Sequence, residues 1–428
     1  MSETKERRSW VWILTPLLAL GLGLSALAAQ GTSVSCEVQK EPIRLMTPAD
    51  VTRIMQVVDT ALSPDGQHIA YVLQVQREPG VDKDGPAYRE LHVSDPSGQS
   101  RPFVTGKVNL SKLRWTPDGR RITYLAKRFD DTHKSVYAIA IDGGESRRVV
   151  GHETAISDYA FSPDGKRVAF LAKEKRDKAY ETAKEQGYNA TVYEEEPRFT
   201  RLWFGELEDG LMPKDAEPTA IPLEGSVSSL AFSPSGEALA LSIAPTPSID
   251  DHYMKRQVHL LNIETKALTG KLETQGKIGA ARFSPSGDKI AIKASADLND
   301  PSSGRLMVGS AEGGALTPAL PLNAEEHVSD FDWLDDDTLV FLSSRGVQTV
   351  LGTVKADGSE AKVLVGPEGP VFWRLSVSRQ AKRAALVGDS PTFPAEVFTA
   401  DLERPGPATR LTTHNPWLKD IHFGRQEA

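Results

Sequence analysis

Ser63-Pro64-Asp65-Gly66 is the first copy of a tetrapeptide that recurs along the chain. It returns as Thr116-Pro117-Asp118-Gly119, Ser162-Pro163-Asp164-Gly165, Ser233-Pro234-Ser235-Gly236 and Ser284-Pro285-Ser286-Gly287. Proline presets φ at the second position of a type I turn, Ser or Thr at the first can bond the local backbone, and glycine tolerates a positive φ. Because a strand-like run follows each copy, we predict a β-hairpin at each. A phosphate-binding glycine loop, the alternative, needs a helix there.

The tetrapeptide belongs to a longer unit that occurs seven times. The residues before the turns are Leu62, Trp115, Phe161, Phe232, Phe283, Trp333 and Val377, the last two in degenerate copies, and we predict that the Trp and Phe residues among them form the core between repeats. Their spacings are 53, 46, 71, 51, 50 and 44 residues. A second hairpin follows each first one, so each repeat is predicted to hold four antiparallel strands.

Seven such units predict an all-β fold, a seven-bladed β-propeller of four-stranded antiparallel blades over residues 59–413. An open β-sandwich is the alternative, but it would not keep one motif in register across the chain. The longest spacing places an insertion at about 173–200, with a helix predicted over Lys173–Gln186.

The N-terminal residues 1–29 resemble an export signal. Lys5, Arg7 and Arg8 precede an apolar run, Trp10–Ala28, which ends in the small-residue pattern Ala26-Leu27-Ala28. We therefore expect an exported protein, periplasmic or extracellular. An uncleaved membrane anchor is the alternative, because the run is close to membrane-spanning length.

Residues 30–58 are predicted to be a linker followed by a short helix. Thr47-Pro48-Ala49-Asp50 places an N-cap, a first-turn proline and a first-turn acid in the usual order, and Val51, Ile54 and Val58 share one helical face.

Composition narrows the function classes. The net charge of −8 and the absence of a basic stripe argue against nucleic acid as a partner. Cys36 is the single cysteine, so neither an internal disulfide nor a cysteine metal site is predicted. The nine histidines show no metal-binding spacing, and no metal or cofactor is predicted.

Three stretches carry a family resemblance: Asp59–Gly66, Trp115–Gly119 and Arg410–Leu418. They are similar to the N-terminal propeller domain of prolyl-oligopeptidase-family serine peptidases, and the acylaminoacyl-peptidase and dipeptidyl-peptidase-like exopeptidases are the nearest branch. The likeness runs from about Pro42 to Glu427. TolB-like propellers share the Ser-Pro-Asp-Gly turn.

The resemblance implies an α/β-hydrolase domain after the propeller, with its serine in a Gly-x-Ser-x-Gly elbow. That elbow does not occur in this sequence, so no catalytic residue is predicted. We expect a non-catalytic propeller that gates or selects peptides, from a truncated or split peptidase whose hydrolase domain is separately encoded. Residues 414–428 would be a tail at the domain junction. The alternative is a free-standing TolB-like periplasmic propeller that binds a protein or peptide on one face.

Glu194, Glu195 and Glu196, in the insertion, are the predicted substrate-binding residues. The resemblance implies that paired glutamates near the propeller bind the free amino terminus of a peptide, since carboxylates accept charge-assisted hydrogen bonds from an ammonium group. A solvated acidic loop is the alternative.

Overall fold

The computed structural model describes residues 43–190, 192, 195–299, 302–321 and 326–427. The predicted export segment 1–29, residues 30–42 with Cys36, and Glu194 lie outside this range. In the part of the chain that is described, no helix combines the length and apolar character needed to cross a membrane.

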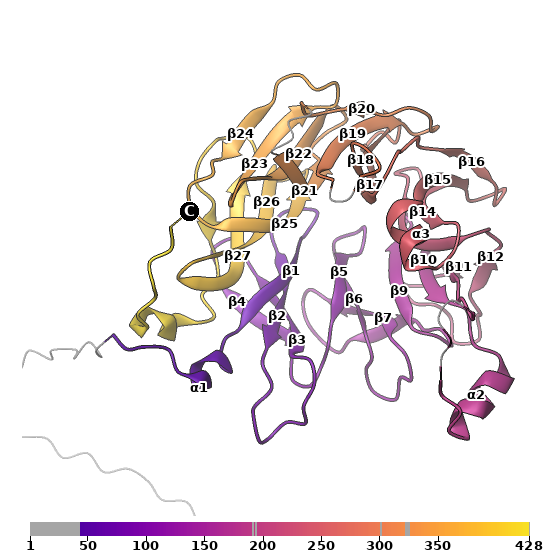
Figure 1. Ribbon diagram of the computed structural model, residues 1–428, viewed down its shortest axis with the longest axis horizontal. Coiled ribbons are helices and arrows are strands. Elements are labelled where there is room, and N and C mark those ends of the chain that lie inside the picture. The colour runs from indigo at the N-terminus through magenta and orange to yellow at the C-terminus, as the bar shows by residue number, and fades with distance from the viewer. Residues whose placement is uncertain (1–42, 191, 193–194, 300–301, 322–325, 428) are drawn as a thin grey trace, which may run out of the picture. The chain divides into compact units, whose positions relative to one another are not determined.

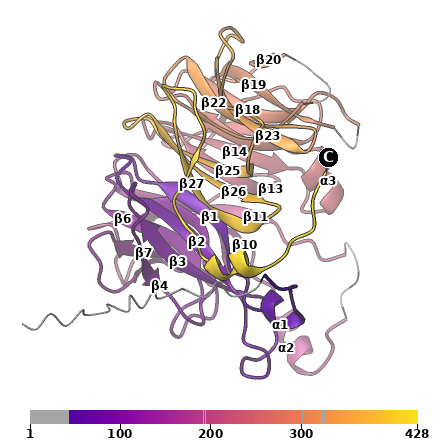
Figure 2. The same cartoon turned by 90° about the vertical axis from the view of Figure 1, so that its left-hand side faces the viewer.

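The described chain forms seven four-stranded antiparallel sheets, each built from four consecutive strands. The fold is therefore the predicted seven-bladed β-propeller (Figures 1 and 2). Blades 1–4 contain β1 (Gln56–Leu62), β2 (Ile69–Val75), β3 (Tyr88–Ser94), β4 (Ser100–Val104); β5 (Ser111–Trp115), β6 (Arg121–Ala126), β7 (Ser135–Ala140), β8 (Arg147–Val150); β9 (Ile156–Phe161), β10 (Arg167–Lys173), β11 (Thr200–Glu206), β12 (Thr219–Ile221); and β13 (Ser226–Phe232), β14 (Ala238–Ala244), β15 (Gln257–Asn262), β16 (Leu268–Lys271).

Blades 5–7 contain β17 (Ile278–Phe283), β18 (Lys289–Ser295), β19 (Gly304–Ser310), β20 (Thr317–Pro318); β21 (Glu326–Trp333), β22 (Thr338–Arg345), β23 (Gln348–Lys355), β24 (Lys362–Val365); and β25 (Val371–Ser378), β26 (Arg383–Ser390), β27 (Phe393–Asp401), β28 (Thr409–Arg410). The first strand of each blade, which we call its inner strand, packs near those of neighbouring blades: β1 contacts β5 and β25, and β13 contacts β9 and β17.

The repeated tetrapeptide forms the predicted turn between the first two strands of a blade. In blade 1 the Gly66 N–H donates to the Ser63 carbonyl at 2.9 Å, and the Asp65 carboxylate accepts from the Ser63 hydroxyl and the Gln67 N–H. Gly66 has a φ of 71°, and a Cβ there would lie 2.3 Å from the Cβ of Ala381 in blade 7. Glycine is required at this turn both for its conformation and for the close approach of the neighbouring blade.

The aromatic residues before the turns fill the space between blades, as predicted. Trp333 is fully buried, and its indole N–H donates to the Arg282 carbonyl of the preceding blade at 2.9 Å. Trp115 makes the equivalent bond to the Ala61 carbonyl at 2.9 Å but is only partly buried. Each tryptophan therefore adds a directional hydrogen bond to the apolar contact between two blades.

Blade 7 meets blade 1 without exchange of a strand, and side chains close this seam. The Ser376 hydroxyl accepts from the Leu62 N–H at 2.9 Å, and the Ser378 hydroxyl donates to the Pro64 carbonyl at 2.6 Å. Asn415 bonds both backbone groups of Met55, as acceptor at 2.9 Å and donor at 2.7 Å. Residues 414–422, expected as a tail, thus lie against the start of the propeller and include the short 3-10 helix η1 (Pro416–Asp420).

The helices are shorter than predicted. Helix α1 (Pro48–Val51) has the expected capping box between Thr47 and Asp50, but Val58 belongs to β1 and does not extend its helical face. In the insertion, β10 continues to Lys173, and α2 (Lys178–Glu185) begins only after the Asp177 N-cap. A third helix, α3 (Ile249–Met254), lies between β14 and β15.

Candidate functional site

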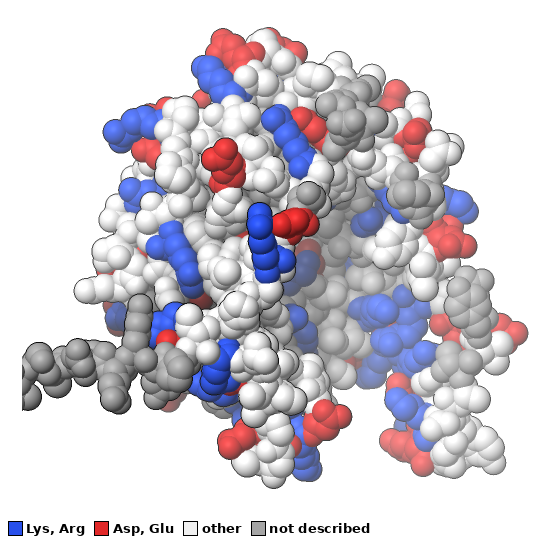
Figure 3. All heavy atoms as spheres, turned by 60° about the vertical axis from the view of Figure 1, so that its left-hand side comes forward, with Lys and Arg blue, Asp and Glu red and all other residues white. Residues whose placement is uncertain are grey.

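A cavity of about 1440 Å³ lies where the inner strands meet, and we call it the axial cavity. Residues of β1, β5, β9, β17, β21 and β25 line it, together with several inter-strand turns. Figure 3 shows a hollowed face of the molecule with Lys and Arg side chains along the hollow. Ligand sites in proteins concentrate in such concave spaces where several elements converge.

Strand periodicity explains the charged lining. We number positions back from the residue that precedes each turn, such as Leu62 or Trp115. The residues one and three positions before it lie on the same face of the strand, because side chains alternate with a period of two. Both positions fall on the inner strands, and in six of the seven blades at least one of them is charged: Asp59, Lys112 with Arg114, Asp158, Arg282, Asp330 with Asp332, and Arg374. In blade 4 they are Ser229 and Ala231. Sequence reasoning missed these residues, although their repeat position was a usable signal.

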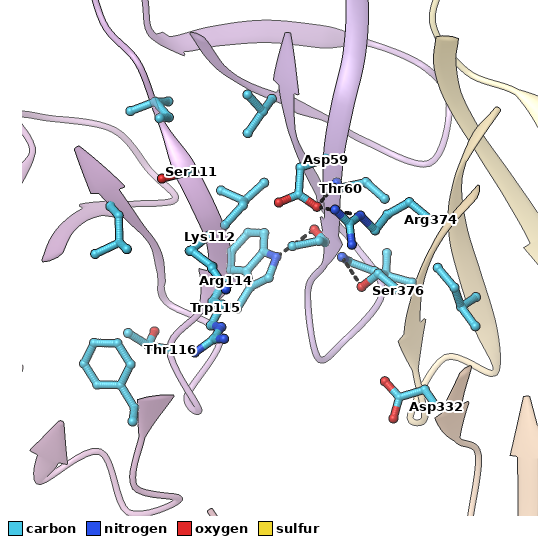
Figure 4. Close-up of a pocket in the computed structure, with 18 of the residues that line it drawn as sticks. Asp59, Thr60, Ser111, Lys112, Arg114, Trp115, Thr116, Asp332, Arg374 and Ser376 are labelled. Atoms are coloured by element: carbon cyan, nitrogen blue, oxygen red, sulfur yellow. Dashed lines mark hydrogen bonds and ion pairs between the residues drawn. The ribbon is translucent and has the colours of Figure 1, made fainter. Parts of the chain in front are cut away.

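Ion pairs join neighbouring blades around the cavity. Each links a guanidinium on one inner strand to a carboxylate on the next: Arg114 to Asp158 at 2.9 Å, Arg282 to Asp330 at 3.1 Å, and Arg374 to Asp59 at 3.2 Å. Figure 4 shows the Asp59–Arg374 pair on one side of the cavity and Lys112 and Arg114 on the other. The charges therefore help to hold the ring and also face the cavity.

Burial changes the electrostatics of this region. Removal from water raises the pKa of Asp59 in spite of the neighbouring Arg374 guanidinium. It also lowers the pKa of Lys293, whose ammonium donates to the Ser329 carbonyl at 3.0 Å. Charges withdrawn from water in this way act on neighbouring groups more strongly than charges in water do.

The predicted acidic site is placed elsewhere. Glu195 and Glu196 are exposed and are not among the residues that line the axial cavity. Glu196 forms an ion pair with Arg176 at 2.7 Å, and the nearby Arg201 pairs instead with Glu174 at 2.7 Å. The substrate-binding role of Glu194, Glu195 and Glu196 stays a prediction.

Searches of known proteins give one curated relative and many similar structures. No protein-family model matches the sequence. A stretch of 101 residues, 23% of this chain, is 32% identical to the uncharacterized peptidase YuxL of Bacillus subtilis (strain 168), of which it covers 15%.

The similar structures include propeller domains of peptidases. An acylaminoacyl peptidase matches with a TM-score of 0.64 and 14% identity over 87% of this chain and 55% of its own. A puromycin-hydrolyzing peptidase of Mycobacterium tuberculosis matches with a TM-score of 0.64 and 16% identity, and the match covers 87% of this chain and 56% of the peptidase. The β-propeller domain of the trilobed protease from Pyrococcus furiosus matches with a TM-score of 0.57 and 14% identity, and the match covers 85% of this chain and 99% of that domain.

The chain thus spans just over half the length of the first two peptidases and nearly all of an isolated propeller domain. Identities of 14–16% establish the fold only. The described chain is a seven-bladed β-propeller similar to the propeller domains of these peptidases.

Proposed function

We propose that this propeller is a non-catalytic module that binds peptides in its axial cavity and selects them for an α/β-hydrolase domain. The observation that carries the proposal is the cavity itself, which is built from the inner strands of six blades and lined with charged groups. Its volume of about 1440 Å³ exceeds the range typical of small-molecule pockets and suits a longer, extended ligand.

A further observation supports a binding role. The similar structures are of peptidases that contain a propeller domain. The hydrolase domain, whether part of the same polypeptide or separately encoded, belongs to the proposal.

Calorimetric titration of the purified chain with a mixed set of short peptides tests this function. Ser111 lines the cavity, so S111W should reduce peptide affinity about tenfold or more by narrowing the cavity beside Lys112 and Arg114. V347W is the control, because Val347 is an exposed loop residue outside the cavity lining. Binding that is unchanged in S111W would contradict a site in the cavity. Labelling of the purified chain by a serine-hydrolase probe would contradict its non-catalytic character.

We also propose that the protein is exported through its N-terminal segment, on the basis of the basic start and apolar run of residues 1–29. Fractionation of cells that produce the full chain should recover it outside the cytoplasm. Replacement of Leu17 and Leu18 by charged residues should retain it inside. Recovery of both forms in the same fraction would contradict export by this segment.

A further inference from the structure

The axial cavity is strongly basic in an acidic protein. Eight Lys or Arg residues line it against three Asp residues, with Asp158 paired to two of the eight cations, whereas the whole chain carries a net charge of −8. A concave site with one excess sign and poorly polarisable walls focuses the field and concentrates ligands of the opposite charge. The cavity is therefore suited to anionic ligands, although the protein as a whole repels them.

Two cations face a single carboxylate at the junction of blades 2 and 3. The Lys112 ammonium lies 3.1 Å from one oxygen of Asp158, and the Arg114 guanidinium lies 2.9 Å from the other. Asp158 is only 7% exposed, but Lys112 is 44% and Arg114 is 33% exposed. Two cations thus share one buried carboxylate and keep N–H donors that a ligand can reach.

The backbone at Lys112 is unusual in a way that favours a functional role. Its φ is 56°, and no other described non-glycine residue of an inner strand has a positive φ. It lies in the register shift between Ser111 and Arg114; the first strand pair of every blade has such a shift, so the left-handed φ is what distinguishes blade 2. Bulges re-aim side chains, and left-handed backbone at a lysine persists only where its surroundings enforce it.

The surroundings of Lys112 do enforce it. The buried Tyr159 hydroxyl donates to the Lys112 carbonyl at 2.8 Å and also bonds the Thr123 hydroxyl at 2.9 Å. The Arg114 guanidinium stacks on the Tyr159 ring, 4.9 Å from its centroid. Tyr159 therefore holds the Lys112 backbone and the Arg114 guanidinium in place before any ligand arrives, which lowers the entropic cost of binding.

We propose that Lys112 and Arg114 form a carboxylate-binding site in the axial cavity, so that the propeller prefers acidic peptides. The ligand group is a carboxylate, either an Asp or Glu side chain or the C-terminus of the peptide. A planar guanidinium beside a flexible ammonium provides several charge-assisted donors for such a group. This inference rests on the proposed function, because it names the class of peptide that the cavity selects.

Calorimetry on the full chain tests the proposal with matched peptides. A glutamate-containing peptide is compared with its glutamine counterpart, and a peptide with a free C-terminus with its amide. We expect the acidic form of at least one pair to bind about tenfold more tightly at low salt, with the preference shrinking at high salt. The pair that shows the preference identifies the source of the carboxylate.

Variants locate the preference. K112Q should remove most of it, and K112R should retain it because the charge remains. K289Q is the matched control: Lys289 also pairs with a carboxylate of the next blade, Asp337 at 2.6 Å, but does not line the cavity. K289Q should leave the preference intact.

The outcomes separate this inference from the proposed function. Equal binding of acidic and neutral peptides, or a preference that survives in K112Q, would overturn the carboxylate site while peptide binding stands. Failure of every peptide to bind would overturn both. Loss of binding to acidic and neutral peptides alike in a folded K112Q would show that Lys112 only shapes the cavity, which also overturns the site.

Discussion

The seam between blades 7 and 1 and the junction between blades 2 and 3 use the same residue types in different proportions. At the seam, Arg374 faces Asp59 one to one, and Asn415 gives and receives one hydrogen bond with Met55. At the other junction, two cations share Asp158. The comparison teaches that matched polar groups close the ring, whereas an unmatched cation is available to a ligand.

Glu396 at the seam should give the largest effect on stability. Its carboxylate is fully buried and accepts from Arg410 at 3.1 Å, from the Thr412 hydroxyl at 2.6 Å and from the His414 N–H at 2.7 Å. E396A leaves these donors without their partner and should lower the free energy of unfolding by about 3–5 kcal/mol. Urea unfolding measures this change. A loss below about 1 kcal/mol would show that the seam does not depend on this network.

His414 makes the seam sensitive to acid. Burial, reinforced by His92 and Arg410, lowers the pKa of His414 to about 4. The unfolded chain therefore binds a proton at higher pH than the folded chain, and stability should fall as the pH drops from about 6.5 towards 4. The full loss is on the order of 3 kcal/mol. Burial raises the pKa of Glu396, so the folded chain takes up this proton at a higher pH than the unfolded chain does. At pH values above the ordinary pKa of a glutamate, Glu396 therefore adds stability on acidification and partly offsets the loss from His414.

The difference between wild type and H414Q isolates the histidine, because Glu396 is present in both. Urea unfolding across this pH range should show a smaller loss of stability on acidification in H414Q. Parallel curves for the two proteins would show that His414 titrates normally in the fold.

The fold was almost wholly predictable, because seven turns in register are local features that each chain segment carries by itself. The helix bounds were less so: Asp177 could have been recognised as the N-cap of α2, but the extension of β10 to Lys173 depends on pairing with β11. The contact between Met55 and Asn415 joins residues 360 positions apart, and no local pattern in either segment predicts that the two meet.

The candidate site was harder to predict for a physical reason. The acidic cluster Glu194–Glu196 is contiguous and therefore visible, whereas Lys112, Arg114 and Asp158 come together only when blades 2 and 3 pack. Alignment of the repeats places each of the three either one or three positions before the residue that precedes the turn, which is Trp115 in blade 2 and Phe161 in blade 3. The sequence of one repeat does not show which face of the inner strand points towards the axis, because that orientation depends on how the blades pack in the ring.

Asn415 should have an intermediate effect on the seam. N415A removes both hydrogen bonds to the Met55 backbone and should cost about 1–2 kcal/mol. N415D keeps an acceptor for the Met55 N–H but turns a carboxylate oxygen towards the buried Met55 carbonyl, so it should be no more stable than N415A in urea unfolding. Equal stability of N415A and wild type would mean that solvent replaces both bonds without cost.

Lys112 should have the smallest effect on stability. It is partly exposed and Arg114 still pairs with Asp158 when it is removed, so K112Q should change the free energy of unfolding by less than about 1 kcal/mol. Urea unfolding of K112Q beside E396A makes the contrast between the two regions quantitative. A loss in K112Q comparable to that in E396A would mean that both regions serve closure alone.

The affinity of D158N for the acidic peptide of the pair that shows the preference tests the central claim most directly. Asparagine keeps the shape of the side chain but removes the carboxylate that competes with the ligand for Lys112 and Arg114. If these cations bind peptide carboxylates, the folded D158N protein should bind this acidic peptide several-fold more tightly than wild type, with no gain for the neutral peptide of the same pair. Unchanged or weaker binding of the acidic peptide by folded D158N would contradict the account.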